Sequence, residues 1–280
     1  MTDVRDPRVT PVRSDIASRA LEGLVAAPAY VDPRPRVVTI PAAGVHARPD
    51  LASEQQDQVL FGEVFEVLGE GDGFAWGQAR RDGYVGFVAL AALGAPAAAA
   101  THRVSAIRTY AFAEPSIKAR ALGPYSLNAL ATEEAREGRF VKAANSGWFV
   151  EEHLAPVGRF ETDPAAVAER FLGAAYLWGG RESLGVDCSG LVQQALLACG
   201  RACPRDTDQQ QQMGYGIEPQ DLARGDLIFW RGHVAIMLDG TRILHANAHH
   251  MATAIEPLAE AVARIAAGPT GEPVAYRRIV

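Results

Sequence analysis

Residues 186–192 read Val-Asp-Cys-Ser-Gly-Leu-Val, and the fold of the whole chain is interpreted outward from this stretch. Asp187 is a residue type that caps helix starts, so a helix is expected to begin with Cys188. Gly200 suits the left-handed position after a helix, which predicts an end near Cys199. Free N–H groups and the positive dipole end of such a helix favour a thiolate at Cys188, and the thiolate is the nucleophilic form.

The chain contains three cysteines, and this small, odd number does not indicate a disulfide framework. Cys199 and Cys203 lack the helix-start context, so we interpret them as small buried residues. Taken alone, Cys188 is open to both interpretations, as a nucleophile or as a core residue.

Two histidines supply a candidate base for the thiol. His233 begins one expected strand and His245 ends the next. A three-residue loop at residues 238–240, with its glycine in the left-handed conformation, would place residue 237 opposite 241 and His233 opposite His245. The two imidazoles would then share one face, roughly 5 Å apart at Cβ. One ring could take the thiol proton while the other orients it.

Composition limits the function classes. At roughly 100–200 residues per domain, 280 residues predict two or three domains. Hydrophobic residues make up 48% and charged residues 21%, which excludes a wholly disordered chain. The formal charge of −6 argues against a nucleic-acid partner. The first residues lack a signal-like apolar core, and the apolar stretch 87–100 is shorter than the roughly 20 residues of a membrane span, so we expect a cytoplasmic protein without a membrane partner.

The chain divides into four parts. Residues 1–36 are expected to form a helix at 13–25, with Ile16, Ala20, Leu21 and Leu24 at helical spacing, and a proline-rich connector. Residues 37–93 show short alternating strands with turn residues at 70–73 and 81–83, as in a small β-barrel.

A second barrel is expected at residues 101–156, after the linker 94–101. The strand ending at 83–88 recurs at 146–150, about 62 residues later, which suggests a tandem repeat. Both segments resemble bacterial SH3-like barrels, which often end in a Gly-Tyr/Trp-Val strand.

Residues 157–280 are expected to form an α+β domain, with helices first and an antiparallel sheet after. Asp163 and Pro164 predict the cap and first turn of a helix that runs to about Ala175. The expected strands are 226–230, 233–238 and 242–246. The whole chain is therefore predicted to be an α+β multidomain protein.

Several motifs of residues 160–280 together resemble the NlpC family of bacterial cysteine peptidases, which cut cell-wall peptides. They occur in the family's order: Tyr-Leu-Trp-Gly-Gly at 176–180, Asp-Cys-Ser-Gly-Leu-Val-Gln at 187–193, Gly-Asp-Leu-Ile-Phe-Trp-Arg-Gly-His-Val-Ala-Ile-Met-Leu at 225–238 and Ile-Leu-His-Ala-Asn at 243–247. The resemblance implies a papain-like fold and four roles: nucleophile for Cys188, base for His233, orienting group for His245 and oxyanion-holding hydroxyl for Tyr176.

The two-barrel-plus-peptidase layout is similar to that of γ-D-glutamyl-diaminoacid endopeptidases, which recycle cell-wall peptides. In those enzymes the first barrel covers one end of the cleft, so only a short peptide with a free L-alanine amine fits. The implied substrate is a murein tripeptide, cut to release L-Ala-γ-D-Glu. The implied substrate-binding residues are Asp187, Ser189, Glu63, Tyr84, Asp206 and Thr207. Glu63 and Tyr84 could equally be a solvent-facing acid and an ordinary barrel aromatic.

Other functions remain open on the same residues. An amidase or acyltransferase on this fold would use the same acyl-enzyme. A wall-binding protein with a silent peptidase domain would lack a triad residue, and none is lost here. His245, His249 and His250 could suggest a metal site, but no cysteine or carboxylate cluster completes a tetrahedral set, so neither a metal nor another cofactor is expected.

Overall fold

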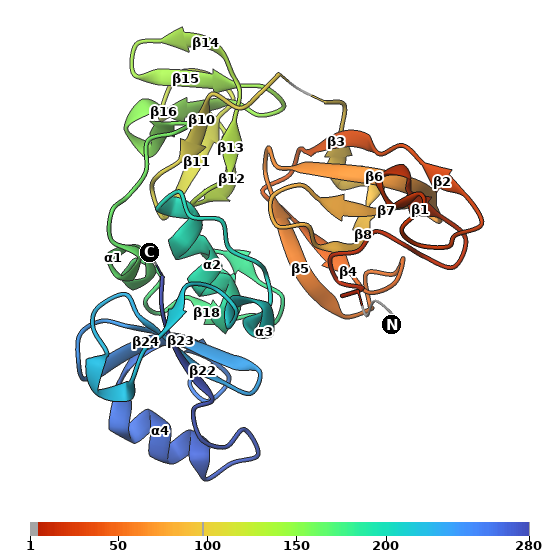
Figure 1. Cartoon of the computed structure of the whole chain (residues 1–280). Helices are drawn as coiled ribbons and strands as arrows, with labels where there is room; N and C mark the ends of the chain where they lie inside the picture. The colour runs from red at the N-terminus through yellow and green to blue at the C-terminus, as the bar shows by residue number, and fades with distance from the viewer. Residues whose placement is uncertain (1–4, 97, 280) are drawn as a thin grey trace. The chain divides into compact units, whose positions relative to one another are not determined.

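The computed structural model describes residues 5–96 and 98–279, which form two compact units. The first unit spans Met1–Val157 and the second spans Gly158–Val280. Figure 1 shows that strands dominate the first unit, whereas the α-helices belong to the second. The predicted fold class, β-rich barrels followed by an α+β domain, is confirmed.

Residues 34–94, all of which the structure describes, form a seven-stranded antiparallel barrel. Its strands are β3 (Arg34–Val38), β4 (Ala42–His46), β5 (Gln55–Leu60), β6 (Val64–Gly71), β7 (Phe74–Ala79), β8 (Val85–Ala89) and β9 (Leu93–Gly94). They pair in the order β5-β4-β8-β7-β6-β3-β9. The turn predicted at 70–73 closes β6 onto β7 with Asp72 and Gly73 at φ 52° and 79°, as a two-residue hairpin turn requires.

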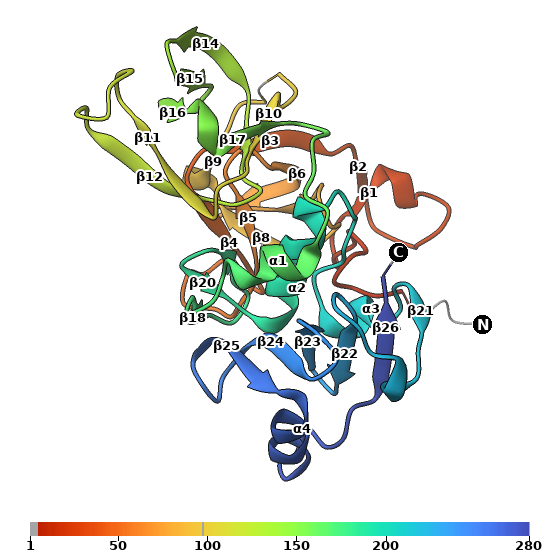
Figure 2. The same ribbon diagram turned by 90° about the vertical axis from the view of Figure 1, so that its left-hand side faces the viewer.

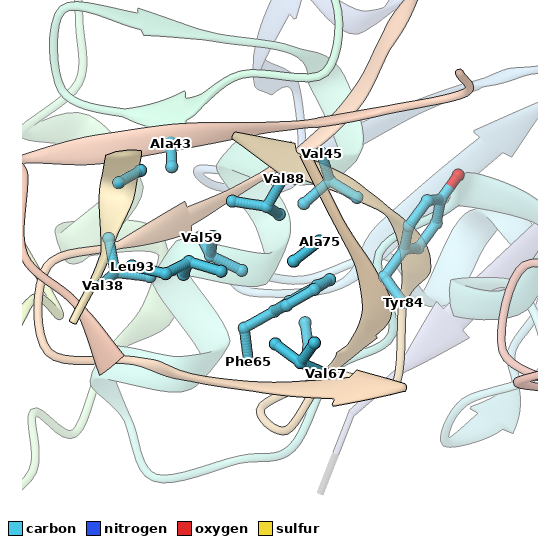
Figure 3. Packing of buried hydrophobic residues seen from close by; sticks show 12 residues of the cluster. Val38, Ala43, Val45, Val59, Phe65, Val67, Ala75, Tyr84, Val88 and Leu93 are labelled. Carbon is cyan, nitrogen blue, oxygen red and sulfur yellow. The ribbon is translucent and has the colours of Figure 1, made fainter. Parts of the chain in front are cut away.

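The core of this barrel follows the alternation of its strands. Phe65 and Val67 on β6 are fully buried, whereas Glu66 between them forms an ion pair with Arg80. Burying one such apolar side chain contributes about 1.5–3 kcal/mol. Figure 3 shows the core side chains gathered between the strands. The buried cluster consists of Val38, Ala43, Val45, Val59, Phe65, Val67, Ala75, Ala79, Tyr84, Val88, Ala92 and Leu93.

The second barrel of the first unit consists of two sheets, ordered β13-β10-β17 and β12-β11-β16-β15-β14. The strands are β10 (His102–Val104), β11 (Arg108–Phe112), β12 (Ala121–Ser126), β13 (Leu130–Ala131), β14 (Glu133–Glu137), β15 (Phe140–Ala143), β16 (Trp148–Val150) and β17 (Leu154–Pro156). Phe61 of the first barrel enters this core, with its ring centroid 4.9 Å from that of Tyr125. The next residue, Gly62, has φ +77°, and a Cβ there would lie 2.0 Å from the carbonyl oxygen of Leu130. Only glycine permits this approach.

Both barrels end in the same succession of elements. Strand β8 is followed by the 3₁₀ turn η2 (Leu90–Ala92) and by β9, and β16 is followed by η3 (Glu151–His153) and by β17. This is the recurrence predicted from residues 83–88 and 146–150.

The prediction of a helix at residues 13–25 is wrong. Ala17–Ser18 forms the short strand β1, which pairs in parallel with β2 (Tyr30–Val31), and only the 3₁₀ turn η1 (Arg19–Leu21) follows. Leu24, expected on the apolar face, is 63% exposed. Strand pairing and the complete burial of Ala17 outweigh the weak helix propensity of this segment.

The second unit is built on a nine-stranded sheet ordered β19-β20-β18-β25-β24-β23-β22-β26-β21. Its strands are β18 (Ala175–Tyr176), β19 (Arg181–Glu182), β20 (Gly185–Val186), β21 (Tyr215–Gly216), β22 (Leu227–Trp230), β23 (His233–Met237), β24 (Arg242–Asn247), β25 (Ala252–Pro257) and β26 (Ala275–Arg278). The helices are α1 (Pro164–Glu169), α2 (Cys188–Ala198), α3 (Thr207–Gln210) and α4 (Leu258–Ala266), with a 3₁₀ turn η4 (Pro219–Asp221).

Helices cover both sides of this sheet. Figures 1 and 2 show α2 and α4 on opposite sides of β22 to β25. Helix α2 packs on β23 and β24, as expected for the helix that bears Cys188. Helix α4 covers an apolar cluster of this unit, which contains Ile228, Trp230, Ala235, Met237 and Ile243.

Helix α1 is shorter than predicted. Asp163 caps it by accepting the N–H groups of Ala165 and Ala166, at 2.9 and 3.2 Å. The helix ends at Glu169 rather than near Ala175, and the turns that follow include Gly173 with φ +79°. In residues 5–96 and 98–279, no helix is long and apolar enough to cross a membrane.

Candidate active site

Helix α2 holds Cys188 in its first turn, as predicted. The Asp187 side chain caps the helix by accepting the N–H of Gly190 at 2.7 Å. The helix ends at Ala198, and Gly200 follows with φ +74°. The cap and the terminating glycine thus fix where the cysteine lies.

The Cys188 thiol is buried, with 6% of the residue exposed. Its Sγ accepts a hydrogen bond from the backbone N–H of Val234 and lies 3.9 Å from the hydroxyl of Thr207. Burial raises the pKa of Cys188 to about 11, and the Asp187 carboxylate adds to this rise. Val234, Thr207 and Arg205 act in the opposite direction. The expectation that the helix start alone would favour a thiolate is therefore wrong: desolvation outweighs it, and the resting thiol needs a base.

A buried ion pair lies next to the nucleophile. Arg205 donates to both carboxylate oxygens of Asp187, at 2.6 and 3.0 Å, and the two side chains are 1% and 8% exposed. Arg205 also donates to the Ser189 hydroxyl at 2.8 Å. Asp187 and Ser189, both predicted to bind the substrate amine, are therefore engaged by Arg205 in this structure.

Thr207 and Asp206 were predicted to line the substrate site. Thr207 lies beside the nucleophile, as its contact with Sγ shows. Asp206 is the cap residue of α3, and its N–H donates to Oε1 of Gln209 at 3.4 Å. Only Thr207 is thus brought into contact with the reacting sulfur.

The histidine hairpin has a different register from the predicted one. Ile236 pairs with Leu244 and Met237 with Ile243, rather than residue 237 with 241. The loop is displaced because Asp239 closes it, accepting the N–H groups of Thr241 and Arg242 at 2.8 and 2.9 Å. Its glycine, Gly240, does not take the left-handed conformation.

The displacement leaves the two histidines on one face, because side chains alternate with a period of two residues. His233 Nε2 lies 2.8 Å from His245 Nδ1, so the predicted pairing of the rings is confirmed. On its other side, His245 Nε2 lies 2.7 Å from Glu256 Oε1. Glu256 also accepts a hydrogen bond from Arg264. We call His233, His245, Glu256 and Arg264 the relay.

The relay rests with neutral imidazoles. Burial lowers the pKa of His233 to about 3, with further lowering by His245 and Arg264. Burial also lowers the pKa of His245, against the opposing effect of its hydrogen bond to Glu256. Both rings are therefore uncharged at neutral pH and able to accept a proton.

The predicted hydrogen bond between Cys188 and His233 is not formed among the described residues; Sγ is bonded to the Val234 N–H instead. Val234 directly follows His233, so the thiol still lies at the start of β23. Catalytic hydrogen bonds are often long before substrate binds and tighten in the complex.

Tyr176 lies on β18, where it pairs in register with Val186, two residues before the nucleophile. Burial raises the pKa of Tyr176, and the charges of the Asp187 carboxylate and of Cys188, when the thiol is ionised, raise it further. The phenol therefore keeps its proton at neutral pH. A protonated donor close to the nucleophile is what stabilisation of an oxyanion requires.

Glu63 and Tyr84, the predicted amine-binding pair, both belong to the first unit. Glu63 is 1% exposed, forms an ion pair with Arg81 and accepts the N–H of Leu60 at 3.0 Å. Tyr84 is 3% exposed and lies at the edge of the barrel core, with its hydroxyl pointing away from the other labelled side chains (Figure 3). Their role in binding an amine stays a prediction.

One group of side chains has a metal-ligand composition. The ligand atoms of His245, His250 and Glu256 lie within 4.8 Å of one another. Arg264, however, donates to the same Glu256 oxygen that faces His245. A guanidinium at this position opposes the binding of a cation, so the group does not fit a metal ion well.

Sequence reasoning missed Arg205, Glu256 and Arg264. Arg205 directly precedes Asp206 and Thr207, two of the implied substrate-binding residues, but the resemblance implies no role for the arginine itself. No sequence signal links Glu256 to His245, because the link arises only from the pairing of β24 with β25.

Residues 173–264 match the NlpC/P60 family. The second unit of this chain belongs to that family. Residues 45–93, in the first barrel, match the bacterial dipeptidyl-peptidase Sh3 domain. The predicted resemblance to a wall-peptidase family with an amino-terminal bacterial SH3 domain is therefore confirmed.

Curated relatives align with part of the chain. The γ-D-glutamyl-L-lysine dipeptidyl-peptidase of Bacillus subtilis strain 168 is 38% identical over 84 residues, which cover 27% of this chain and 28% of the relative. The murein DD-endopeptidase MepS/murein LD-carboxypeptidase of Escherichia coli K12 is 36% identical over 81 residues, covering 27% and 43%. The aligned segment thus spans less than half of either relative.

A solved structure shares the fold over most of the chain. The crystal structure of an NlpC/P60 family protein from Bacillus cereus ATCC 10987 superposes with a TM-score of 0.74. The match covers 87% of this chain and 99% of the other at 19% sequence identity.

The buried pair yields a stability prediction. Arg205→Met leaves the Asp187 carboxylate without its cation, so we expect the second unit to lose about 3–5 kcal/mol. Asp187→Asn combined with Arg205→Met removes both charges and should recover much of this loss. Urea-dependent pulse proteolysis, with second-unit fragments identified by mass spectrometry, gives the free energy of unfolding. The exposed Arg242→Met is the control, expected within about 1 kcal/mol of wild type. If Arg205→Met matches that control, the pair is not buried as described.

The pKa directions predict how Cys188 reacts. With a raised thiol pKa and a neutral His233, the thiolate fraction should grow about tenfold per pH unit below the thiol pKa. Alkylation of Cys188 by iodoacetamide should therefore accelerate throughout pH 6–9, measured by peptide mapping against Cys199. A rate that is constant from pH 5 to 8 would instead show a resting thiolate–imidazolium pair.

Proposed function

We propose that this chain is a cysteine peptidase that hydrolyses the bond between γ-D-glutamate and diaminopimelate or lysine in cell-wall stem peptides. The main support for this proposal is the position of the Cys188 thiol at the start of β23, next to the paired histidines. Nε2 of His233 lies 2.8 Å from Nδ1 of His245. That arrangement occurs in a domain of the NlpC/P60 family.

The first half-reaction forms an acyl-enzyme. His233 takes the thiol proton, and Sγ attacks the γ-carbonyl carbon of the glutamate. The oxyanion is held by the Tyr176 hydroxyl and by a backbone N–H of the first turn of α2, where N–H groups have no partner within the helix. When the tetrahedral intermediate collapses, the C–N bond breaks and the protonated His233 gives its proton to the leaving amine.

The second half-reaction regenerates the enzyme. His233 takes a proton from water, and the hydroxide adds to the thioester carbonyl. The C–S bond breaks, Cys188 regains a proton from His233, and the glutamyl carboxylate is released. The relay stabilises each transient imidazolium through His245 and Glu256, whose carboxylate is 2.7 Å from His245.

Two comparisons support the substrate class. A relative is named a γ-D-glutamyl-L-lysine dipeptidyl-peptidase, and the first barrel matches a domain named for dipeptidyl-peptidases. An enzyme of that kind removes two residues from a free amino terminus. We therefore propose that the substrate carries a free L-alanine amine and that the product is L-Ala-γ-D-Glu.

The proposed site of action is the cytoplasm, where free stem peptides would be recycled. Cell fractionation with an antibody against the native protein tests this directly. Recovery of the protein in the cell-wall fraction would favour action on intact wall.

The specificity prediction compares free L-Ala-γ-D-Glu-L-Lys and its diaminopimelate counterpart with their N-acetylated forms. Acetylation removes the charge and adds bulk at the amine, so we expect cleavage at least about a hundredfold slower. Products are read by mass spectrometry, with Cys188→Ala as the inactive control and Cys203→Ala as the active one. Equal rates on free and acetylated peptides would contradict the free-amine requirement. Cleavage of intact sacculi alone, or transfer to an added amine instead of water, would indicate a wall endopeptidase or an acyltransferase.

A further inference from the structure

Glu256 lies beyond the two histidines, on the side of the relay away from Cys188. It stands on β25, in register with Ile243 of β24. Its Oε1 is 2.7 Å from Nε2 of His245, a side chain with no exposed surface, while the carboxylate itself is 12% exposed. Nη2 of Arg264 donates to the same oxygen at 2.5 Å.

A carboxylate at this place determines where the protons of both rings lie. An ionised carboxylate can only accept, so His245 Nε2 must carry a hydrogen. In a neutral ring the other nitrogen, Nδ1, is then an acceptor, and His233 Nε2 must donate to it across 2.8 Å. In neutral His233 this leaves Nδ1 without a proton, ready to take one from the thiol.

The guanidinium of Arg264, which faces Glu256 from α4, keeps the carboxylate ionised. His250 Nδ1 lies 3.7 Å from Glu256 Oε1. Burial raises the pKa of Glu256, but the hydrogen bonds from His245 and Arg264 outweigh this, and the net pKa is lowered. The carboxylate is thus an acceptor throughout the neutral range.

We propose that Glu256 is a positioning residue that fixes the tautomers of His245 and, through it, of His233. The inference rests on the proposed roles of Cys188 and His233, and it adds a fourth group that sets the direction of proton transfer. Arg264 holds the carboxylate in place. In the absence of an acceptor at Glu256, His245 could instead carry its proton on Nδ1, and His233 would then be protonated on the nitrogen that must act as base.

The test compares Glu, Gln and Ala at position 256 in an Arg264→Met background, so that no variant leaves the arginine without its anion. Nitrogen-15 NMR of the histidine rings reports the tautomers without any substrate. Glu256 and Glu256→Gln, which keeps an acceptor oxygen, should both show Nε2–H on His233 and His245. Glu256→Ala should show new Nδ1–H signals on both rings.

Kinetics provide the second readout. Glu256→Ala should lower kcat on the stem tripeptide about 10- to 100-fold with KM nearly unchanged, and Glu256→Gln should recover most of the loss. Glu260→Gln, an exposed acid on α4, is the control for charge alone. Unchanged ring tautomers in Glu256→Ala, or a kcat within twofold of its background, would overturn the proposal. If the wild type cleaves no tripeptide while the tautomers change as described, the proposed function fails and the assignment of Glu256 stands.

Discussion

Burial of the Cys188 thiol is the constraint on which the rest of the site depends. A thiol removed from water keeps its proton, and its pKa rises to about 11 despite the helix start beneath it. The site must therefore bring a base, and the base must be uncharged. Burial of His233 meets this second demand by lowering its pKa to about 3. The same desolvation that keeps the thiol protonated thus keeps its proton acceptor uncharged.

The positive charge that His233 gains with the thiol proton is stabilised farther along the relay. An imidazolium at His233 is stabilised through His245 by the Glu256 carboxylate, and Arg264 balances the carboxylate while no proton is being transferred. On the other side of Cys188, Asp187 and Arg205 form a second neutralised pair. Two carboxylates with matched guanidiniums, the buried Asp187 and the partly exposed Glu256, therefore flank a nucleophile and base that are both neutral at rest. This separation of fixed charges from the reacting groups allows a buried site to remain folded.

Local sequence signals predicted the parts of the site that depend on local physics. The Asp187 cap, the extent of α2 and the pairing of the two histidines follow from capping and strand alternation, and the structure contains all three. The hairpin register was predicted wrongly, because the Asp239 side chain closes the loop where a left-handed glycine was expected. The rings still meet, since a displacement by two residues preserves the face.

Interactions between distant segments could not be predicted in this way. Arg205 reaches Asp187 only through the approach of α3 to α2, and Glu256 reaches His245 only through the pairing of β25 with β24. The prediction of a helix at residues 13–25 failed for a related reason. The apolar spacing there is helical, but β1 pairs with β2, and no local sequence pattern predicts that pairing. Propensity and periodicity describe one segment at a time, whereas these features depend on a partner strand or helix.

The most direct test of the account is to trap the covalent intermediate. The wild-type protein would be mixed with L-Ala-γ-D-Glu-L-Lys, quenched in acid within milliseconds and analysed by intact-protein and peptide mass spectrometry. The account predicts a thioester-linked L-Ala-γ-D-Glu acyl group on Cys188, accumulating before free dipeptide appears if hydrolysis of the thioester is the slower step. An acyl group on Cys199 or Cys203, or on Cys188 from cleavage at a different bond of the peptide, would contradict it.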